Sequence, residues 1–336
     1  MLNTNLWNRT DVVFLDSMVN LNEKELITRT GEKVETQRLY DGRWAFVAEN
    51  IPALSSEVYQ IVSKKKSSRR FVSMIAENKI LNNGIVRVEI DEVKGTISSF
   101  KRVGDSYEYA SNSGLNDYLY TGRYASDPQG IEQILNIRVL DDGAVAATLR
   151  IESKAPGCNT LWRDVTVYKG IDRVDICNTL DKQDILDFEN VRFVFPFNIQ
   201  QPEITMDLAM SEIHPEREQL EGVNKHYYSL QNGLAVGDLE HAVCLTTVDA
   251  PFVELGSPSG LDYRLNPRHG YGWWQSAKIS PIVYSWVMTN TWRTNYKASQ
   301  GGTAKFRYSL QPCNPLDLKL KQRGAEREME LVAVAS

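Results

Sequence analysis

Hydrophobic residues recur at every second position in many short stretches of this chain, which is the spacing of half-buried β-strands. In residues 304–310, apolar side chains alternate with Lys305, Arg307 and Ser309, so this stretch predicts one apolar face and one polar face. The same alternation in residues 284–288 predicts that three large side chains share a face: Tyr284, Trp286 and Met288. These two stretches are therefore interpreted as neighbouring antiparallel strands.

The same period predicts a long series of short strands before them. We expect strands at residues 11–15, 44–47, 58–62, 85–90, 96–100, 145–151, 165–167, 174–176, 191–197 and 243–247. Turn residues such as Asp41-Gly42 and Lys94-Gly95 separate them. Between residues 80 and 312 no stretch shows the sustained 3.6-residue apolar spacing of a helix. The pattern therefore predicts an all-β protein.

A basic segment, residues 64–70, divides the strands into two groups, and its lack of aromatic residues indicates a solvated linker. A chain of 336 residues suits one large β-domain with a smaller partner. We predict a small β-domain over residues 1–70, a large antiparallel β-sandwich over residues 76–316, and a tail over residues 317–336. The tail is charged and then apolar, so it is a terminal helix or strand, or the start of a further element.

The loop at residues 289–303 is about three times longer than a usual hairpin loop. It contains Asn290, Trp292, Arg293 and Asn295. Amide and guanidinium groups can orient hydroxyl groups, and an aromatic face can stack on an apolar ring face. We therefore predict that this loop binds a ligand; the alternative is a structural loop held in place by Trp292.

Two other aromatic segments were considered as parts of a binding site. Trp273-Trp274 follows a glycine-rich turn and forms either a sugar-stacking platform or a plug of the core, and the plug is favoured. Residues 115–120 mix polar and aromatic side chains, as the edge of a cleft does.

The bulk composition narrows the range of partners. The formal net charge of -5, from 38 basic and 43 acidic residues, gives no general attraction to phosphate backbones or anionic lipid. No apolar run approaches the roughly 18 residues needed to span a bilayer. We therefore expect neither a nucleic acid nor a membrane as partner.

Residues for metal or nucleophilic chemistry are sparse. His214, His226, His241 and His269 each lack a partner histidine or aspartate two or four residues away, so no metal site is predicted in this chain. The four cysteines form no Cys-x-x-Cys pair and are either free thiols or two disulfides: Cys158, Cys177, Cys244 and Cys313. No Gly-x-Ser-x-Gly element is present. Loop carboxylates such as Asp117, Asp127 and Asp262 are interpreted as solvated, so no catalytic residue is assigned.

Several short motifs occur along the chain in a definite order. They are Asn3-Thr4 with Arg9-Thr10-Asp11-Val12-Val13, Val34-Glu35-Thr36-Gln37, Ile51-Pro52-Ala53-Leu54, Gly95-Thr96-Ile97-Ser98-Ser99, and Asn290-x-Trp292-x-Thr294-Asn295-Tyr296 followed by Gln300-Gly301-Gly302. Together they resemble the C-terminal β-region of glycoside hydrolase family 38, the retaining α-mannosidases, and the last resembles a signature of its bacterial branch. The resemblance covers residues 3–312.

The resemblance implies that zinc and the aspartate nucleophile belong to an N-terminal catalytic domain that this sequence lacks. Zinc is then the cofactor of that domain, and no cofactor is expected in this chain. The resemblance also implies a galactose-mutarotase-like fold for the large sandwich, which would pack on the catalytic domain and lend residues to the sugar cleft. Tyr118 resembles an active-site tyrosine that animal members supply from this region, with Tyr120 as the alternative.

These features lead to three hypotheses. The first is the β-sandwich region of an α-mannosidase-like hydrolase, which completes a mannoside cleft, supports its own N-terminal catalytic domain and is inactive alone. Its expected substrate-binding residues are Tyr118, Asn290, Trp292, Arg293 and Asn295. The second is an independent carbohydrate-binding module. The third is a mutarotase-like enzyme, for which His269 with Asp262 is the nearest candidate pair. The sequence does not determine the compartment, and the resemblance to the bacterial branch leaves the cytoplasm and the periplasm as the alternatives.

Overall fold

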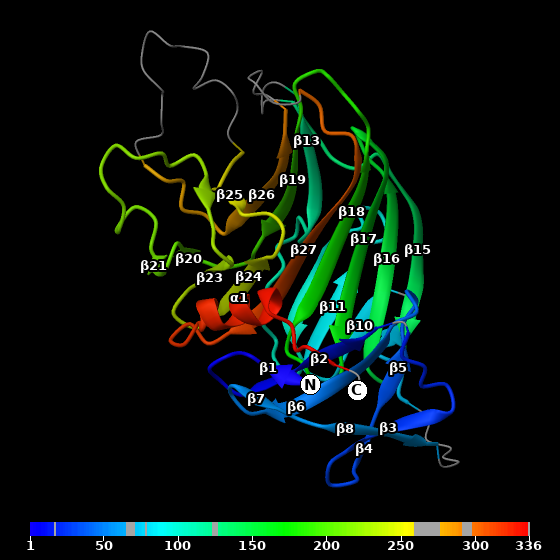
Figure 1. Ribbon diagram of the computed structural model, residues 1–336. Helices are drawn as coiled ribbons and strands as arrows, with labels where there is room; N and C mark the ends of the chain where they lie inside the picture. The colour runs from blue at the N-terminus through cyan, green and yellow to red at the C-terminus, as the bar shows by residue number, and fades with distance from the viewer. Residues whose placement is uncertain are drawn as a thin grey trace.

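The protein was analysed as a computed structural model that describes residues 1–16, 18–64, 71–77, 79–122, 127–258, 276–290 and 298–334. A small group of N-terminal strands lies at one end of a large two-layer antiparallel sandwich (Figure 1). The prediction of an all-β fold, with a large sandwich and a smaller N-terminal β-domain, is confirmed. In the described chain no helix is long and apolar enough to cross a membrane.

The first layer of the sandwich is a sheet with nine strands in the described part of the chain. Their order is β15 (Gln133–Asp142), β16 (Ala146–Lys154), β17 (Cys158–Tyr168), β18 (Val174–Lys182), β27 (Gly302–Cys313), β24 (Ala242–Thr247), β23 (Gly233–Gly237), β20 (Glu203–Leu208) and β21 (Ser211–Ile213). All neighbours pair antiparallel. β27 lies near the middle, between β18 and β24, although it comes last in the sequence.

The second layer consists of two sheets. Among the described residues one has six strands: β14 (Pro128–Gln129), β13 (Asp117–Thr121), β19 (Asn190–Pro196), β26 (Ile282–Thr289), β25 (Phe252–Leu255) and β22 (Tyr228–Ser229). The other has four: β12 (Ile97–Arg102), β11 (Val86–Ile90), β10 (Ile80–Asn82) and β9 (Ile75–Ala76). Isolated bridges from Ile97 to Leu115 and from Ala110 to Phe197 extend the pairing at their junction.

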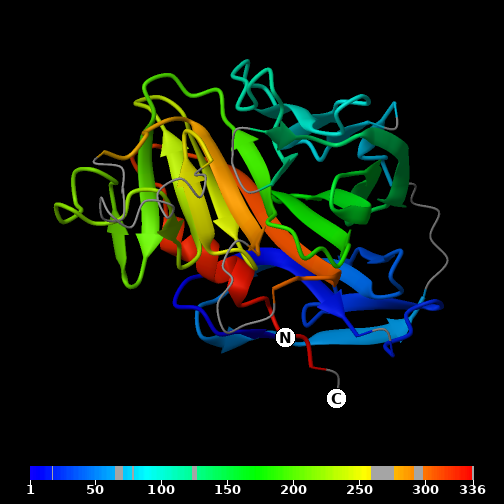
Figure 2. The same ribbon diagram turned by 90° about the horizontal axis from the view of Figure 1, so that it is seen from above.

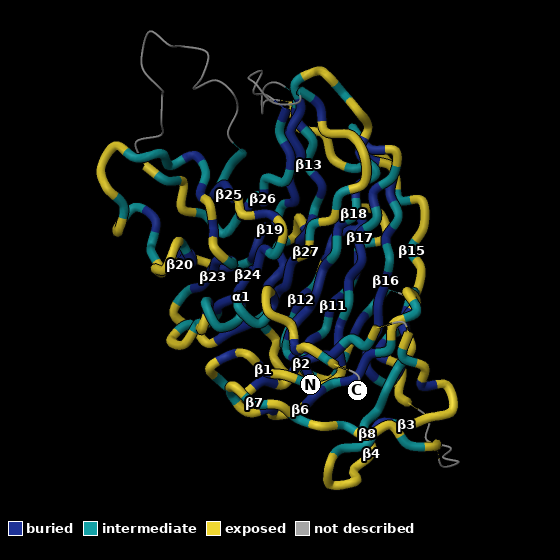
Figure 3. Tube along the Cα trace, in the orientation of Figure 1, coloured by how far each residue is buried: buried dark blue, intermediate teal, exposed yellow. Residues whose placement is uncertain are grey.

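The main hydrophobic core lies between these layers. Phe193 and Phe195 of β19 are fully buried and pack against Tyr308 of β27, with ring centroids 6.2 and 5.1 Å apart. Each buried aromatic side chain of this kind contributes about 2 to 3 kcal/mol of hydrophobic stabilisation. Buried residues follow the central strands, whereas turns and the edge strand β15 are exposed (Figure 3). The period-2 pattern therefore identified the correct inner faces of these strands.

Two predictions for this part of the chain are wrong. β26 pairs with β19 and β25, whereas β27 pairs with β18 and β24, so residues 284–288 and 304–310 belong to opposite layers and are not neighbouring strands. The second error arises because β26 contains an irregularity. Trp286 pairs with Arg192, but Met288 pairs with the neighbouring Val191, so Val287 is an extra residue. A residue inserted in this way reverses the direction of the side chains that follow it. Tyr284 and Trp286 therefore lie on the outer face of the sheet, whereas Met288 turns into the core.

The small N-terminal domain consists of short sheets. One contains β2 (Arg9–Leu15), β6 (Trp44–Ile51) and β5 (Thr36–Arg38); another contains β4 (Lys33–Val34), β3 (Lys24–Thr28) and β8 (Tyr59–Ser63); the pair β1 (Leu2–Asn3) and β7 (Ser55–Ser56) completes it. Val12 and Ala45 share a hydrophobic cluster with Val145, Tyr168 and Ile171 of the large sandwich. The two domains are thus packed together through apolar side chains.

The C-terminal tail connects the two domains. Helix α1 (Leu320–Glu328) lies against β23 and β24, and both views show it beside the nine-stranded sheet (Figures 1 and 2). Leu320 packs there against Cys244 and Cys313. After the helix the chain returns to the small domain, where Leu331 is buried and Val332 pairs with Leu2. The tail is therefore a folded strap across both domains.

Candidate functional site

The described end of the predicted binding loop is held firmly by Asn290, which follows β26 directly. Its side-chain Nδ2 donates hydrogen bonds to the carbonyl oxygens of Ile185, at 3.0 Å, and Asp187, at 2.7 Å. Its Oδ1 accepts from the backbone N–H of Glu189 at 2.5 Å. Three hydrogen bonds thus tie the Asn290 amide to the segment between β18 and β19, and the residue acts as an anchor of the loop. A sugar contact by the same residue stays a prediction.

The other end of the loop rests on the same segment. A Cβ atom built on Gly301 would lie 2.8 Å from Cβ and 3.1 Å from Cα of Asp184, so only glycine permits this close approach. Residues 184–189 thus hold both ends of the loop. Trp292, Arg293 and Asn295 lie outside the described residues, as do Trp273, Trp274, His269 and Asp262, so the predictions made for them stay predictions.

Tyr118 lies inside the sandwich on β13. It is 1% exposed, and its hydroxyl group donates a 2.6 Å hydrogen bond to the carbonyl oxygen of Pro156. Burial, reinforced by the nearby thiol of Cys158, raises the pKa of Tyr118 far above its usual value, so the hydroxyl stays protonated. Its predicted contact with substrate stays a prediction.

Tyr120, the alternative to Tyr118, is more open and belongs to a buried ionic cluster. Its hydroxyl donates to Oε2 of Glu189 at 2.9 Å, and Lys182 Nζ lies 2.7 Å from the other carboxylate oxygen. Glu189 is fully buried, and Lys182 also donates to the carbonyl oxygen of Gln183. Since Glu189 also pairs through its backbone with Asn290, this cluster joins Tyr120 to the loop anchor.

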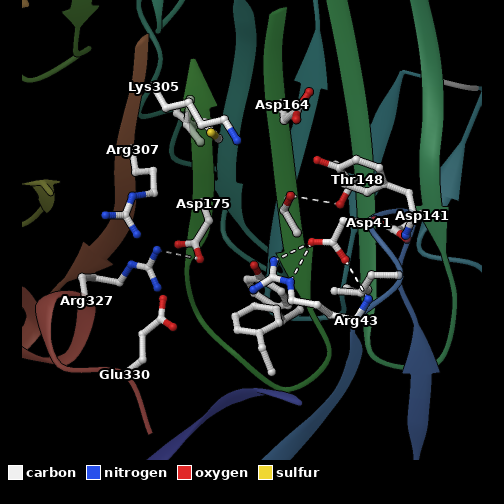
Figure 4. A pocket seen from close by; sticks show the side chains of 18 of the residues that line it. Asp41, Arg43, Asp141, Thr148, Asp164, Asp175, Lys305, Arg307, Arg327 and Glu330 are labelled. Atoms are coloured by element: carbon white, nitrogen blue, oxygen red, sulfur yellow. Dashed lines mark hydrogen bonds and ion pairs between the residues drawn. The ribbon is translucent and has the colours of Figure 1, made fainter. Parts of the chain in front are cut away.

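A second candidate site is a polar cavity of about 550 Å³ on the outer face of the nine-stranded sheet, where the small domain and the tail meet that sheet (Figure 4). Its charged lining comes from all three parts of the chain. These residues are Asp41, Arg43, Asp141, Asp164, Asp175, Asp249, Lys305, Arg307, Arg327 and Glu330.

Several carboxylates in the cavity wall are held in ion pairs. Arg150 binds Asp164 through two hydrogen bonds of 2.7 and 2.6 Å, and Arg307 binds Asp249 through two of 2.9 Å. Burial alone would raise the pKa of Asp249, but its hydrogen bonds and ion pair with Arg307 outweigh burial and lower that pKa. Since these carboxylates are held in ion pairs, we assign them no catalytic role.

At the base of the cavity a buried ionic network joins the domains. Asp11 of the small domain binds Arg9 at 2.6 Å and Arg173 of the large sandwich at 2.9 Å. Arg173 continues to Asp175 at 2.8 Å, which also contacts Arg327 of the tail at 3.3 Å. The cavity is therefore a seam between three parts of the chain. Sequence analysis did not identify it. A local signal was present, since Arg-x-Asp occurs at residues 9–11 and 173–175 and the two side chains of each motif form an ion pair.

Within the residues that the structure describes, no group of three or more histidine, cysteine, aspartate or glutamate side chains could hold a metal ion. The four cysteines are free thiols in the structure. The resemblance implies zinc in a separate catalytic domain and none in this chain, and this expectation stays a prediction.

Comparisons with known proteins show the fold. No protein-family model and no curated protein matches the sequence. An α-mannosidase from Enterococcus faecalis V583 matches 97% of this chain with a TM-score of 0.71 and 12% sequence identity. A protein of glycosyl hydrolase family 38 from Enterococcus faecalis also matches 97%, with a TM-score of 0.68 and 12% identity. This chain has the fold of part of these two structures.

The match covers only part of each of these two structures. It covers 44% of the first structure and 46% of the second, so this chain spans less than half of their length. A galactose mutarotase-like protein from Lactobacillus casei ATCC 334 matches 70% of this chain with a TM-score of 0.40, which is too low to establish a shared fold. The resemblance stated from the sequence is thus confirmed at the level of the fold.

Proposed function

We propose that this chain is the β-region of an α-mannosidase-like glycoside hydrolase, which completes the sugar cleft and supports a separate catalytic domain. The observation that carries this proposal is the agreement in fold over 97% of the chain with two structures, one described as an α-mannosidase and the other as a protein of glycosyl hydrolase family 38. More than half of each of those chains lies outside the match. We assign zinc and the reacting carboxyl groups to that remaining part.

The predicted binding loop supports the cleft role. Its two ends are fixed by Asn290 and Gly301 on one segment of the sandwich, so the loop starts and ends on a rigid element. Retaining glycosidases need two carboxyl groups on either side of the scissile bond, together with contacts that position the sugar ring. In this proposal the chain supplies positioning contacts to a mannoside or a related carbohydrate.

An apolar surface around the β1–β7 pair supports the role of a docking partner. Leu2, Leu6, Leu54, Val58 and Val332 are all exposed there. Three backbone contacts bring these residues together. β1 pairs with β7, the Leu54 N–H donates to the Asn5 carbonyl oxygen, and Leu2 forms a bridge with Val332. Leu54 also adopts a positive φ of 48°, which is strained for a leucine. Exposed apolar residues gathered in this way are typical of a contact with another domain.

The proposal is tested by hydrolysis of an aryl α-mannoside with zinc present. We expect turnover by the full product of the gene and none by this chain alone. An aryl β-mannoside and an aryl α-glucoside serve as controls for the substrate class. Turnover by this chain alone would contradict the proposal and would require a nucleophile among its own carboxylates.

An independent carbohydrate-binding module is the second candidate. The anchors of the loop at Asn290 and Gly301 all come from this chain, so its described ends need no other domain for support. Binding of mannosides by this chain, combined with no hydrolysis by the full gene product, would favour this candidate.

A further inference from the structure

A second, smaller pocket lies beside the predicted binding loop. It has a volume of about 260 Å³, and its lining includes Phe252 of β25 and Trp286 of β26. These two strands are neighbours in the six-stranded sheet and are labelled in Figure 1. Thr289 and Gln300, from the two described ends of the loop region, form part of its wall. The other described residues that line it are apolar and mostly aromatic.

Three of these lining residues are aromatic, and the others are Val287 and Met288. Tyr227 stands edge-on to both Phe252 and Trp286, with ring centroids 5.8 and 5.9 Å apart and interplanar angles of 87° and 75°. Phe252 is 44% exposed, although an outer sheet face normally carries polar residues. An aromatic cluster left partly open to solvent on a sheet face is typical of a binding surface.

The indole of Trp286 is fixed by its surroundings. Its Nε1 donates to the carbonyl oxygen of Met288 at 3.1 Å, and the guanidinium carbon of Arg192 lies 4.6 Å from its ring centroid. Arg192 is itself held by a fully buried ion pair with Glu254. The rigid placement of Trp286 lowers the entropic cost of packing a ligand against it.

The chemistry of the wall points to an uncharged ligand. No described residue that lines this pocket carries a charge, in contrast to the cavity in Figure 4. The hydroxyl group of Thr289 and the amide group of Gln300 can still hydrogen-bond to a ligand. A sugar ring matches both features, since its C–H face packs on aromatic rings while its hydroxyl groups take hydrogen bonds.

We propose that Tyr227, Phe252 and Trp286 form a subsite for one neutral pyranose ring. That this ring belongs to a mannoside rests on the proposed function. Arg192 is then a positioning residue, because it acts through Trp286 and not on the sugar.

The test measures binding of methyl α-D-mannopyranoside to this chain by NMR titration. We expect Phe252→Ala and Tyr227→Ala each to weaken binding by about tenfold, which corresponds to about 1.4 kcal/mol. Phe71→Ala removes an exposed aromatic side chain elsewhere and is expected to leave the affinity unchanged. Gln300→Ala, at an exposed position, gives a second test that does not depend on aromatic packing.

Equal affinity in wild type, Phe252→Ala, Tyr227→Ala and Gln300→Ala would overturn the proposal, as would an absence of binding to the wild type. Failure of this pocket proposal can be distinguished from failure of the proposed function. Hydrolysis by the full gene product together with unaffected binding in these variants would reject only the pocket. Weakened binding in the variants without hydrolysis by the full product would support the pocket and reject the hydrolase.

Discussion

Arg173 Nη2 donates a 2.9 Å hydrogen bond to Oδ1 of Asp11, although 162 residues separate the two in the sequence. Both side chains are almost completely buried, and the bond joins the large sandwich to β2 of the small domain. Breaking a buried pair from one side leaves an uncompensated charge, which is far more costly than removing both partners. The stability of the interface between the two domains, called the seam here, therefore depends on this pair.

Asp11→Asn is the first test of the seam. Because Arg173 and Arg9 then lose their shared carboxylate, we expect the free energy of unfolding to fall by about 3 to 5 kcal/mol. Urea unfolding followed by circular dichroism measures the change. Glu203→Gln is the matched control, since Glu203 pairs with Arg217 at the surface, and it is expected to cost less than about 0.5 kcal/mol. Equal effects of the two variants would contradict the account.

The same pair predicts how stability depends on acid. Burial would raise the pKa of Asp11, but the ion pairs and hydrogen bond with Arg173 and Arg9 outweigh burial and lower it below its value of 3.8. A lowered folded pKa contributes stability that is full above the unfolded pKa and is lost as pH falls through the folded value. We expect wild type to lose stability below about pH 4 more steeply than Asp11→Asn does. Urea unfolding midpoints measured from pH 6 to pH 2.5 test this. If they fall equally steeply in wild type and Asp11→Asn, Asp11 does not make this contribution.

Asn290→Ala tests the anchor of the predicted binding loop. The variant leaves the Glu189 N–H and the carbonyl oxygens of Ile185 and Asp187 without their partner. We expect a loss of about 1 to 3 kcal/mol and faster amide hydrogen exchange in residues 183–189. Asn159→Ala removes a single, exposed amide contact to Asp181 and should leave that exchange unchanged. Unchanged exchange in Asn290→Ala would show that the anchor is dispensable.

Gly95→Ala tests how closely the turn before β12 packs on the sheet. A Cβ at Gly95 would lie 2.2 Å from Nη2 of Arg163 and 2.8 Å from Cγ2 of Ile151, and the residue has a φ of +64°. Gly104, with a φ of +87°, has no atom within 4 Å of such a Cβ. We expect Gly104→Ala to cost about 1 to 2 kcal/mol for backbone strain alone, and Gly95→Ala to cost at least about 3 kcal/mol. Similar melting temperatures for the two variants would refute the close contact.

The strands of the sandwich could be predicted because an alternating pattern identifies both the strand and its buried face. Phe193 and Phe195 illustrate this, since their spacing alone placed them in the core. Met288 could not be placed in the same way. Val287 becomes an extra residue only when β26 pairs with β19, and the alternation within β26 carries no information about that partner strand.

The candidate sites were less predictable, because they depend on contacts between distant segments. Asn290 was selected for its amide, but only the structure shows that this amide is taken up by the segment before β19. Asp11 and Arg173 each look like ordinary polar residues on an outward face until the two domains are packed together. Local sequence does not reveal which outward faces become covered.

The central claim, that this chain forms part of the sugar cleft, is tested most directly by steady-state kinetics of the full gene product. The measurement compares KM and kcat for an aryl α-mannoside between wild type and Arg293→Ala, with Phe71→Ala as the control. Loss of a contact made equally to ground state and transition state raises KM and leaves kcat unchanged. We predict that KM rises about tenfold in Arg293→Ala while kcat stays within about twofold, and that Phe71→Ala changes neither. Unchanged KM and kcat in a folded Arg293→Ala enzyme would contradict the claim.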